Sequence, residues 1–321
     1  MKPSRFEYVR ASAVEEAVAV LAEHGDDAKV LAGGQSLVPL LNMRLAAPAV
    51  LVDVNWAAGL DRIRSDNGSV HVGALVRQAA CEGSQVVQTR LPLVAECLPS
   101  VGHFVTRNRG TVGGSLAHAD AKAELPLALL CLGGAVVTRS VRGERTVPAE
   151  ELFVTHFTTS LAPDELLVDT IWPAARDGEA FAFEEFALRA GDYAIAMAGC
   201  AIRGASTRVA VAGPFEAPYV FEAADPAEAA ETARAAAEPR DSLHASAAYQ
   251  RHLVGLLAAR VVQTAMSRGQ TPGRGRTGPV PGAGPPLDAD AGGASPRGYP
   301  QGHDPTGHVP GTDPRTWPEG T

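Results

Sequence analysis

Two glycine pairs, each placed between apolar runs, constrain the fold of this 321-residue chain more than any other feature. The first lies in the segment AGGQS at residues 32–36, and the second lies in GTVGGS at residues 110–115. Because glycine lacks a Cβ, adjacent glycines let the backbone turn sharply and come close to a ligand. One pair by itself is explained by a tight turn, but two pairs in matching contexts favour two turns that face one polyanionic ligand.

The chemistry of such turns suits phosphate oxygens. Successive backbone N–H groups form an anion-binding nest, and a helix that begins just beyond the turn adds the positive end of its dipole. Both turns are therefore predicted to act as nests, and the hydroxyl groups of Ser36 and Thr111 can donate as well. A P-loop is excluded, because no Gly-Lys-Ser/Thr follows either turn. This favours a bound cofactor over a hydrolysed nucleotide.

Composition sets the class of protein. A hydrophobic fraction of 45% and a net charge of −8 predict a soluble, globular chain of two domains. Its acidic residues are spread out and no basic patch is visible, which argues against nucleic acid as a partner. Neither a membrane span nor an apolar leader is visible, so a cytoplasmic location is expected. The four cysteines are far apart and read as buried thiols, so a metal cluster held by this chain alone is not expected.

Apolar spacing predicts the elements around these turns. A helix over 14–22 is expected to begin at a capping box of Ser12 and Glu15 and to end at Gly25. Strands over 29–32 and 50–53 are expected to flank the first turn, with a helix over 37–45 between them. Further strands are predicted at 70–72, 136–139, 145–147 and 166–172, and further helices at 75–87, 93–98 and 125–132, the last of them buried.

The last part of the chain follows a different pattern. Segments 182–188, 194–202 and 208–212 predict a small antiparallel sheet, and Ala-rich helices are expected at 226–237 and 246–266. Beyond these the composition changes to Gly, Pro and small polar residues, which predicts a disordered tail over 269–321. The tail contains a G-x-G-x-x-G match at residues 273–278 that we attribute to chance, because no strand precedes it and no helix pattern follows.

Two long segments carry a family resemblance. KVLAGGQSLVPLLNMRLAAPAVLVDVN at residues 29–55 and RNRGTVGGSLAHADAKAELPLALLCLGG at residues 107–134 resemble the two FAD-binding signatures of the medium, flavoprotein subunit of molybdenum hydroxylases. Within that superfamily they are most similar to the aerobic carbon monoxide dehydrogenase branch. The resemblance implies an α+β fold of the vanillyl-alcohol-oxidase (PCMH) type over 1–175, in subdomains of about 1–57 and 58–175. It also implies a C-terminal α/β domain over 176–268.

The same resemblance assigns site residues. Both glycine turns are expected to wrap the FAD diphosphate, and acidic residues after the second turn are expected to hold ribityl or adenosine hydroxyls. An aromatic residue that opens the C-terminal domain is expected beside the isoalloxazine ring. The residues so assigned are Lys29, Ala32, Gly33, Gly34, Gln35, Ser36, Leu37, Thr111, Gly113, Gly114, Ser115, Asp120, Glu124 and Tyr193. Simpler alternatives stay open for two of them, a solvated helix start for Glu124 and a strand anchor for Tyr193.

One departure from the family pattern concerns the loop after the second turn. The family usually has proline after the Ala119-Asp120 pair, whereas Ala121 and Lys122 follow here, so the loop geometry is expected to differ locally. His103 and His118 flank the second turn and receive no catalytic role.

The function implied by the resemblance is electron transfer. FAD in this chain would collect electrons from a small subunit with two [2Fe-2S] clusters, after a large molybdenum-cofactor subunit oxidises the substrate, and would pass them to an external acceptor. The implied assembly is a dimer of heterotrimers. The identity of the substrate and of the acceptor stays open. The alternatives are a stand-alone flavin oxidase of the same fold and a flavin-free scaffold or binding module.

Overall fold

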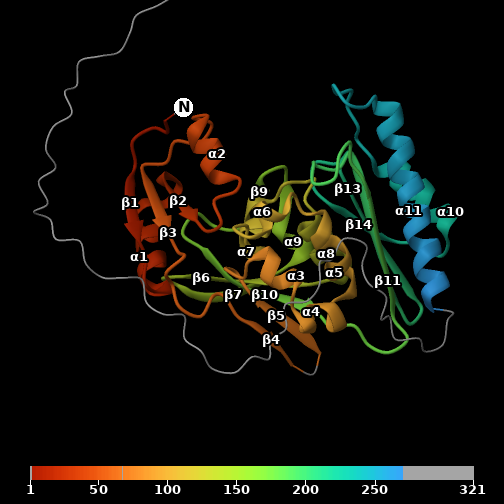
Figure 1. Ribbon diagram of the computed structural model, residues 1–321, viewed down its shortest axis with the longest axis horizontal. Coiled ribbons are helices and arrows are strands. Elements are labelled where there is room, and N and C mark those ends of the chain that lie inside the picture. Colours follow the sequence, from red (N-terminus) through yellow and green to blue (C-terminus); the bar gives the residue numbers. More distant parts are fainter. Residues whose placement is uncertain (1, 67, 270–321) are drawn as a thin grey trace, which may run out of the picture. The chain divides into compact units, whose positions relative to one another are not determined.

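Three larger β-sheets and a two-stranded ribbon form the framework of the computed structural model, which describes residues 2–66 and 68–269 (Figure 1). All of these elements belong to one unit of the chain, residues 1–273. The predicted tail and its glycine motif lie outside the described residues.

The first sheet is parallel and carries the first glycine turn. It has the order β1-β3-β2, from β1 (Glu7–Arg10), β3 (Val50–Asp53) and β2 (Ala28–Leu31), so that Val9 and Val30 both pair with Val52. Helix α1 (Val14–His24) packs on this sheet, η1 (Gly25–Asp27) follows it, and α2 (Leu37–Asn42) follows the turn. The predicted strand–turn–helix–strand unit is confirmed, whereas β1 was not foreseen.

The capping box predicted between Ser12 and Glu15 is wrong, because Ser12 pairs with Glu16 instead. The N-cap of α1 is Ala13, one residue later than expected, so the third helical position is Glu16 and not Glu15. Both the backbone N–H and the hydroxyl of Ser12 donate to Oε2 of Glu16, at 2.8 and 2.9 Å.

The central sheet is antiparallel, with the order β4-β5-β10-β6-β7. Its strands are β4 (Ile63–Ser65), β5 (Ser69–Gly73), β10 (Leu166–Pro173), β6 (Ala135–Ser140) and β7 (Gly143–Pro148). The ribbon pairs β8 (Phe153–Thr155) with β9 (Thr158–Thr159). Several short helices lie between these strands: α3 (Gln78–Glu82), α4 (Gln85–Arg90), α5 (Pro92–Cys97), η2 (Leu98–Ser100), α6 (Phe104–Arg107), α7 (Val112–His118), α8 (Glu124–Leu132) and α9 (Ala149–Leu152).

The helix predicted over 75–87 forms only in part, as the two short helices α3 and α4. Residues 75–77 stay outside the helix: the N–H of Val76 closes a turn onto the carbonyl of Gly73 at 3.0 Å, Arg77 forms a bridge with Thr111, and the N–H of Gln78 donates to the carbonyl of Gly110 at 2.9 Å. Helix α3 begins only after this pairing and ends at Gly83. Pairing with the second glycine turn therefore keeps residues 75–77 out of the helix that their apolar spacing predicts.

The third sheet is antiparallel, as predicted. It has the order β11-β12-β13-β14, from β11 (Ala180–Phe186), β12 (Ala196–Arg203), β13 (Ser206–Ala212) and β14 (Tyr219–Glu222). Helices α10 (Pro226–Ala236) and α11 (Ala247–Gly269) cover one face, and α5 and α8 lie on the other (Figure 1). Side chains alternate accordingly along the strands: Phe181 and Met197 pack in the cluster that contains α5 and α8, and Ala182 and Ala198 pack with α10 and α11.

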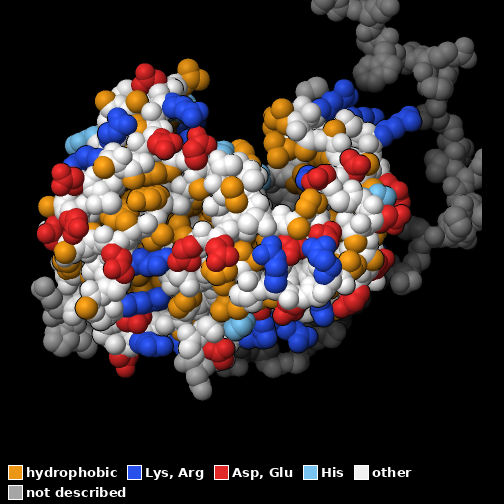
Figure 2. Space-filling model, turned by 180° about the vertical axis from the view of Figure 1, so that it is seen from behind, with side chains coloured by type: hydrophobic (Ala, Val, Ile, Leu, Met, Phe, Trp, Pro, Cys, Tyr) orange, Lys and Arg blue, Asp and Glu red, His pale blue; other side chains and the backbone are white. Residues whose placement is uncertain are grey.

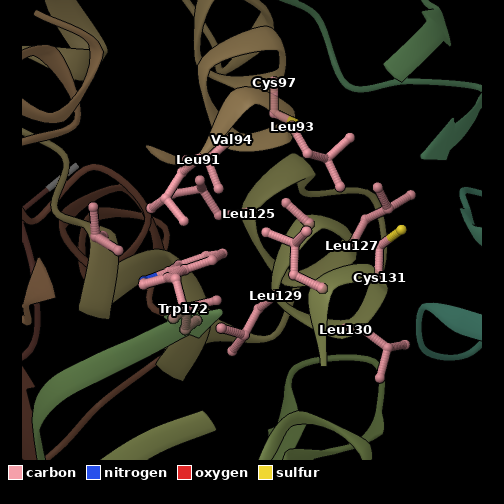
Figure 3. Close-up of a cluster of buried hydrophobic side chains, with 14 of the residues drawn as sticks. Leu91, Leu93, Val94, Cys97, Leu125, Leu127, Leu129, Leu130, Cys131 and Trp172 are labelled. Carbon is pink, nitrogen blue, oxygen red and sulfur yellow. The ribbon is translucent and has the colours of Figure 1, made fainter. Parts of the chain in front are cut away.

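The central core surrounds α8. Every residue of this helix is buried, and Gly133, with φ +66°, ends it in the left-handed conformation, as the sequence predicts. Leu125 and Leu129 lie beside the indole of Trp172 (Figure 3). That indole N–H donates to Oγ1 of Thr170 at 2.7 Å, so the largest buried side chain leaves no unpaired polar atom. Helix α8 is therefore held in place by packing along its whole length. This packing also fixes the position of its first residue, Glu124.

The two glycine turns touch through their backbones. A Cβ added to Gly33 would lie 2.5 Å from the carbonyl oxygen of Arg109 and 2.8 Å from the Cα of Gly110. Side chains cannot be accommodated at such distances, so glycine at position 33 is required by the neighbouring turn. Gly34 has φ +71°, which is a conformation that side chains disfavour.

A chain of polar side chains joins the same two turns. Nδ2 of Asn55 donates to the carbonyl of Ala32 at 2.8 Å, and its Oδ1 accepts from Arg77 at 2.7 Å. Arg77 also donates to the carbonyl of Arg109 at 2.6 Å. Asp53 orients Asn55 by accepting from its backbone N–H, and Tyr8 donates to the other carboxylate oxygen. The separation of the turns is thus set by hydrogen bonds as well as by contact.

This contact predicts the effect of a single methyl group. We expect Gly33→Ala to lower the free energy of unfolding by about 1–3 kcal/mol, because the backbone atoms that it meets cannot rotate away. Gly83→Ala is the matched control, since its Cβ would find only ordinary contact, 3.6 Å from the carbonyl of Ala79. Urea unfolding followed by circular dichroism measures both. Equal stability of the two variants would contradict the assigned backbone contact.

Candidate functional site

A cavity of about 640 Å³ lies between the two glycine turns and extends to the loop before β12. Its volume is in the range of sites that hold cofactors. The structure brings all fourteen residues assigned from the sequence to the lining of this one cavity: Lys29, Ala32, Gly33, Gly34, Gln35, Ser36, Leu37, Thr111, Gly113, Gly114, Ser115, Asp120, Glu124 and Tyr193. That they bind FAD stays a prediction.

The first turn offers backbone donors to the cavity. In the described part of the chain, the N–H groups of Gly33, Gly34, Gln35 and Ser36 donate to no protein acceptor. The turn holds its shape through its carbonyls, since Gly34 O accepts from Val38 N at 3.0 Å and Gly33 O accepts from Nε2 of Gln35 at 3.1 Å. This arrangement fits the predicted anion nest.

The second turn differs from the prediction. The N–H groups of Val112, Gly113 and Ser115 donate to the carbonyls of Val76, Ala74 and Thr111, and that of Gly114 donates to Oγ1 of Thr111 at 3.0 Å. These four N–H groups were expected to face a ligand, but they donate to acceptors within the protein. The hydroxyl of Thr111 keeps its own proton for donation. The second turn is a closely packed wall rather than a second nest.

The acidic residues after the second turn are buried. Asp120 is 6% exposed, and its Oδ1 accepts from the backbone N–H of Lys122 at 2.9 Å. Glu124, also 6% exposed, begins α8. Burial, together with the negative charges of Glu185 and Asp120, raises the pKa of Glu124 to about 8. Glu124 therefore enters the cavity as a neutral acid at pH 7, which is able to donate a hydrogen bond as well as to accept one.

Tyr193 lies at the exposed end of the cavity. It is 62% exposed, and partial desolvation followed by the charge of Asp120 raises its pKa. Gly191 of the same loop packs against the ring of His103, where an added Cβ would lie 2.6 Å from Nδ1. The loop before β12 is thereby held against the segment that leads to the second turn. An exposed aromatic ring at this place fits the predicted position beside a flat ligand.

Sequence reasoning missed several residues of the lining. Gln78 lies in the wall, and so does the segment 159–167, which joins β9 to β10. His103 and His118 also line the cavity, and burial lowers the pKa of His118 so that it stays neutral. Gln78 lies inside the helix predicted over 75–87, whereas in the structure it opens the shorter helix α3. Segment 159–167 carries no motif, and only its position against the turns identifies it.

The donor set suits a dinucleotide cofactor. Free backbone N–H groups at the first turn meet the needs of phosphate oxygens, and Lys29 adds a cation beside them. Buried polar side chains in the lining, among them Gln78, suit a ligand that has its own donors and acceptors. Among the described residues, no group of His, Cys, Asp and Glu side chains could hold a metal ion. The cavity thus fits an organic, anionic ligand.

Three further observations concern the surface, the helices and the cysteines. On the face shown in Figure 2, acidic and basic side chains are interspersed, so the net charge of −8 is not gathered into one patch there. Within residues 2–66 and 68–269, the helices are too short or too polar to cross a bilayer. All four cysteines are buried and free.

Comparison with known proteins places the chain in a family. Residues 4–175 match the FAD binding domain in molybdopterin dehydrogenase. The 6-hydroxypseudooxynicotine dehydrogenase complex subunit alpha of Paenarthrobacter nicotinovorans is 40% identical over 84% of this chain and 97% of its own length. The carbon monoxide dehydrogenase medium chain of Hydrogenophaga pseudoflava is 34% identical over 84% of this chain and 99% of its own.

A solved structure shows the same architecture. Quinoline 2-oxidoreductase from Pseudomonas putida 86 superposes with a TM-score of 0.78 at 33% identity, over 84% of this chain and 100% of that one. The α+β fold predicted from the sequence is confirmed by these matches. The chain belongs to the family of FAD-binding medium subunits of molybdopterin dehydrogenases, in the group that resembles the carbon monoxide dehydrogenase medium chain.

Proposed function

We propose that this chain binds FAD in the cavity between its glycine turns and acts as the electron-transfer subunit of a molybdenum hydroxylase. It accepts electrons from the [2Fe-2S] clusters of a partner subunit and passes them to an external acceptor. One observation carries the proposal: the fourteen residues assigned from the sequence line one cavity, and the first turn presents unpaired N–H groups to it.

Residues of different chemistry would hold different parts of the cofactor. The N–H groups of residues 33–36 would hold the diphosphate, with Lys29 adding positive charge. Neutral Glu124 and the carboxylate oxygens of Asp120 would hold hydroxyl groups, the first as donor or acceptor and the second as acceptors. Tyr193 would cover the ring system. FAD itself supplies the capacity to take up and release electrons, and the protein positions it and limits the access of water.

The partners follow from the family. The relatives are a complex subunit and a medium chain, which supports a subunit role here. We propose a small [2Fe-2S] subunit and a large molybdenum-cofactor subunit as partners, in a dimer of heterotrimers. We also propose a cytoplasmic location, which the four free thiols support, because thiols persist in a reducing compartment.

The rival functions are separable by experiment. A stand-alone flavin oxidase of the same fold would oxidise a substrate without partners, so isolation of a monomer with such activity from the native cell would refute the subunit role. A flavin-free scaffold would not bind FAD at all.

Flavin binding is the first prediction of the proposal. The purified full chain mixed with FAD should retain the visible absorption bands of oxidised flavin after gel filtration. Riboflavin lacks the diphosphate, so it should bind much more weakly than FAD if the first turn holds phosphates. Lys29→Met should weaken FAD binding about threefold to tenfold without changing riboflavin binding. The exposed Lys2→Met is the control. A chain that retains no flavin, or that binds both flavins equally, would contradict the proposal.

The buried acid predicts a dependence of stability on pH. The pKa of Glu124 is about 8 when folded against a reference value of 4.5, so the folded chain holds an extra proton between these values. Its contribution to stability is full below the lower value and is lost as pH rises toward the upper one, by at most about 1.4 kcal/mol per pH unit. Glu124→Gln cannot ionise and should lose this slope.

The measurement compares the free energies of unfolding of the apo chain from about pH 5 to about pH 8. Relative to wild type, Glu124→Gln should gain stability as pH rises, whereas the exposed Glu144→Gln should follow wild type throughout. Parallel curves for wild type and Glu124→Gln would show that Glu124 is ionised in the folded chain.

A further inference from the structure

Asn55 is a neighbour of the first turn to which the sequence assigns no role. It follows β3, and it lines a second cavity of about 480 Å³ that shares Gly33, Gly34 and Gln35 with the main cavity. Asn55 itself belongs to the lining of the second cavity and not to that of the main one. The first turn therefore lies between two cavities, and Asn55 contacts it from the side of the second.

The free N–H groups of the first turn owe their direction to the peptide units to which they belong. All peptide bonds of the described residues are trans. In a trans peptide the C=O and the N–H of one unit point in opposite directions. The carbonyl of Ala32 and the N–H of Gly33 belong to one such unit. A group that holds this carbonyl on one side of the turn therefore directs the N–H toward the other side.

Three successive peptide units of the turn have a hydrogen bond at the carbonyl. The carbonyl of Ala32 accepts from Nδ2 of Asn55 at 2.8 Å. Those of Gly33 and Gly34 accept from Nε2 of Gln35 at 3.1 Å and from a backbone N–H of α2 at 3.0 Å. The N–H groups of the same three units donate to no protein acceptor within residues 2–66 and 68–269. Each carbonyl that is held thus corresponds to one free donor.

Glycine makes these hydrogen bonds necessary. The peptide unit between Ala32 and Gly33 rotates about one torsion of each residue, and a residue without a Cβ permits more than one orientation of that unit. The carbonyl of Arg109 excludes a side chain at position 33, so a bulkier residue cannot supply the missing restraint. A side chain from outside the turn has to hold the carbonyl instead, and Asn55 is the residue that does so.

The partners of Asn55 fix the orientation of its carboxamide. Its Nδ2 also donates to Oδ1 of Asp53 at 2.6 Å, and its Oδ1 accepts from Arg77 at 2.7 Å. Arg77 can only donate, whereas the carbonyl of Ala32 and the carboxylate of Asp53 can only accept. A reversed carboxamide would place its oxygen against both acceptors and its nitrogen against the guanidinium. The protein itself therefore directs the donor of Asn55 at the carbonyl of Ala32.

We infer that Asn55 is a positioning residue of the anion nest. Its carboxamide holds the carbonyl of Ala32 and thereby keeps the N–H of Gly33 directed toward the cofactor cavity. This inference rests on the proposed function, in which the first turn holds the FAD diphosphate. A donor that is already held in place loses little freedom when a phosphate binds, so the restraint raises affinity. Asn55 acts through the turn alone, because it does not line the main cavity.

The test compares Asn55→Leu with Asn42→Leu in the full chain. Leucine is close in size to asparagine but has no donor, and the exposed Asn42 of α2 controls for the loss of a carboxamide near the turn. Asn55→Leu should raise the Kd for FAD about threefold to tenfold, which corresponds to the loss of about one hydrogen bond. Its Kd for riboflavin should stay at the wild-type value, because riboflavin lacks the diphosphate. Asn42→Leu should match wild type with both flavins.

The outcomes separate the possible failures. If wild type itself does not bind FAD, the proposed function fails. If wild type binds FAD and Asn55→Leu has the same Kd for it, this inference is overturned. A Kd raised by the same factor for FAD and for riboflavin would also overturn it, because the effect would then come from a general distortion of the cavity. A loss of affinity confined to FAD supports the positioning role.

A second variant covers the case in which Asn55→Leu does not fold, as judged by circular dichroism. Asn55→Asp keeps the shape of the side chain and its contact with Arg77, whose charge keeps the new carboxylate ionised, and it removes the donor that holds Ala32. Its Kd for FAD should rise at least about threefold, while its Kd for riboflavin stays at the wild-type value. An unchanged Kd for FAD in this variant would overturn the inference.

Discussion

The backbone contact between the two glycine turns is the constraint on which the candidate site depends. Gly33 lies against Arg109 and Gly110 so closely that no side chain fits between them, and Asn55 and Arg77 hold the same two segments by hydrogen bonds. The turns come from different parts of the chain. The parallel sheet that carries the first turn shares a hydrophobic cluster with strands β6 and β10 of the central sheet, and this packing brings the turns together.

Two turns of similar sequence serve different purposes in the folded protein. The first keeps its N–H groups free, whereas the second uses them to bind the carbonyls of Ala74, Val76 and Thr111. The difference follows from what lies beside each turn. Residues 74–77 lie next to the second turn and supply the carbonyls of Ala74 and Val76 as acceptors, whereas no described residue supplies such acceptors to the first turn. Anion binding is therefore concentrated on one wall, and the other wall provides rigidity and close approach.

The polar groups of the cavity are graded from one end to the other. Free backbone donors and Lys29 lie at the end formed by the first turn, while the other end has the neutral acid Glu124 and the exposed ring of Tyr193. A ligand with phosphates in its middle and a polar aromatic ring at one end matches this order. Burial sets the state of the acid at that end, since it raises the pKa of Glu124.

Local sequence determined the elements and the family. The glycine pairs, the buried helix 125–132 and the alternating strands of the third sheet are visible in residue order, because turn chemistry and side-chain period act over a few residues. Tertiary structure decided the rest. It kept residues 75–77 out of a helix, paired the N–H groups of the second turn within the protein and raised the pKa of Glu124. It also left the carboxamide of Gln78 without a partner. Each of these depends on which distant backbone lies alongside, and no local pattern of residues records that.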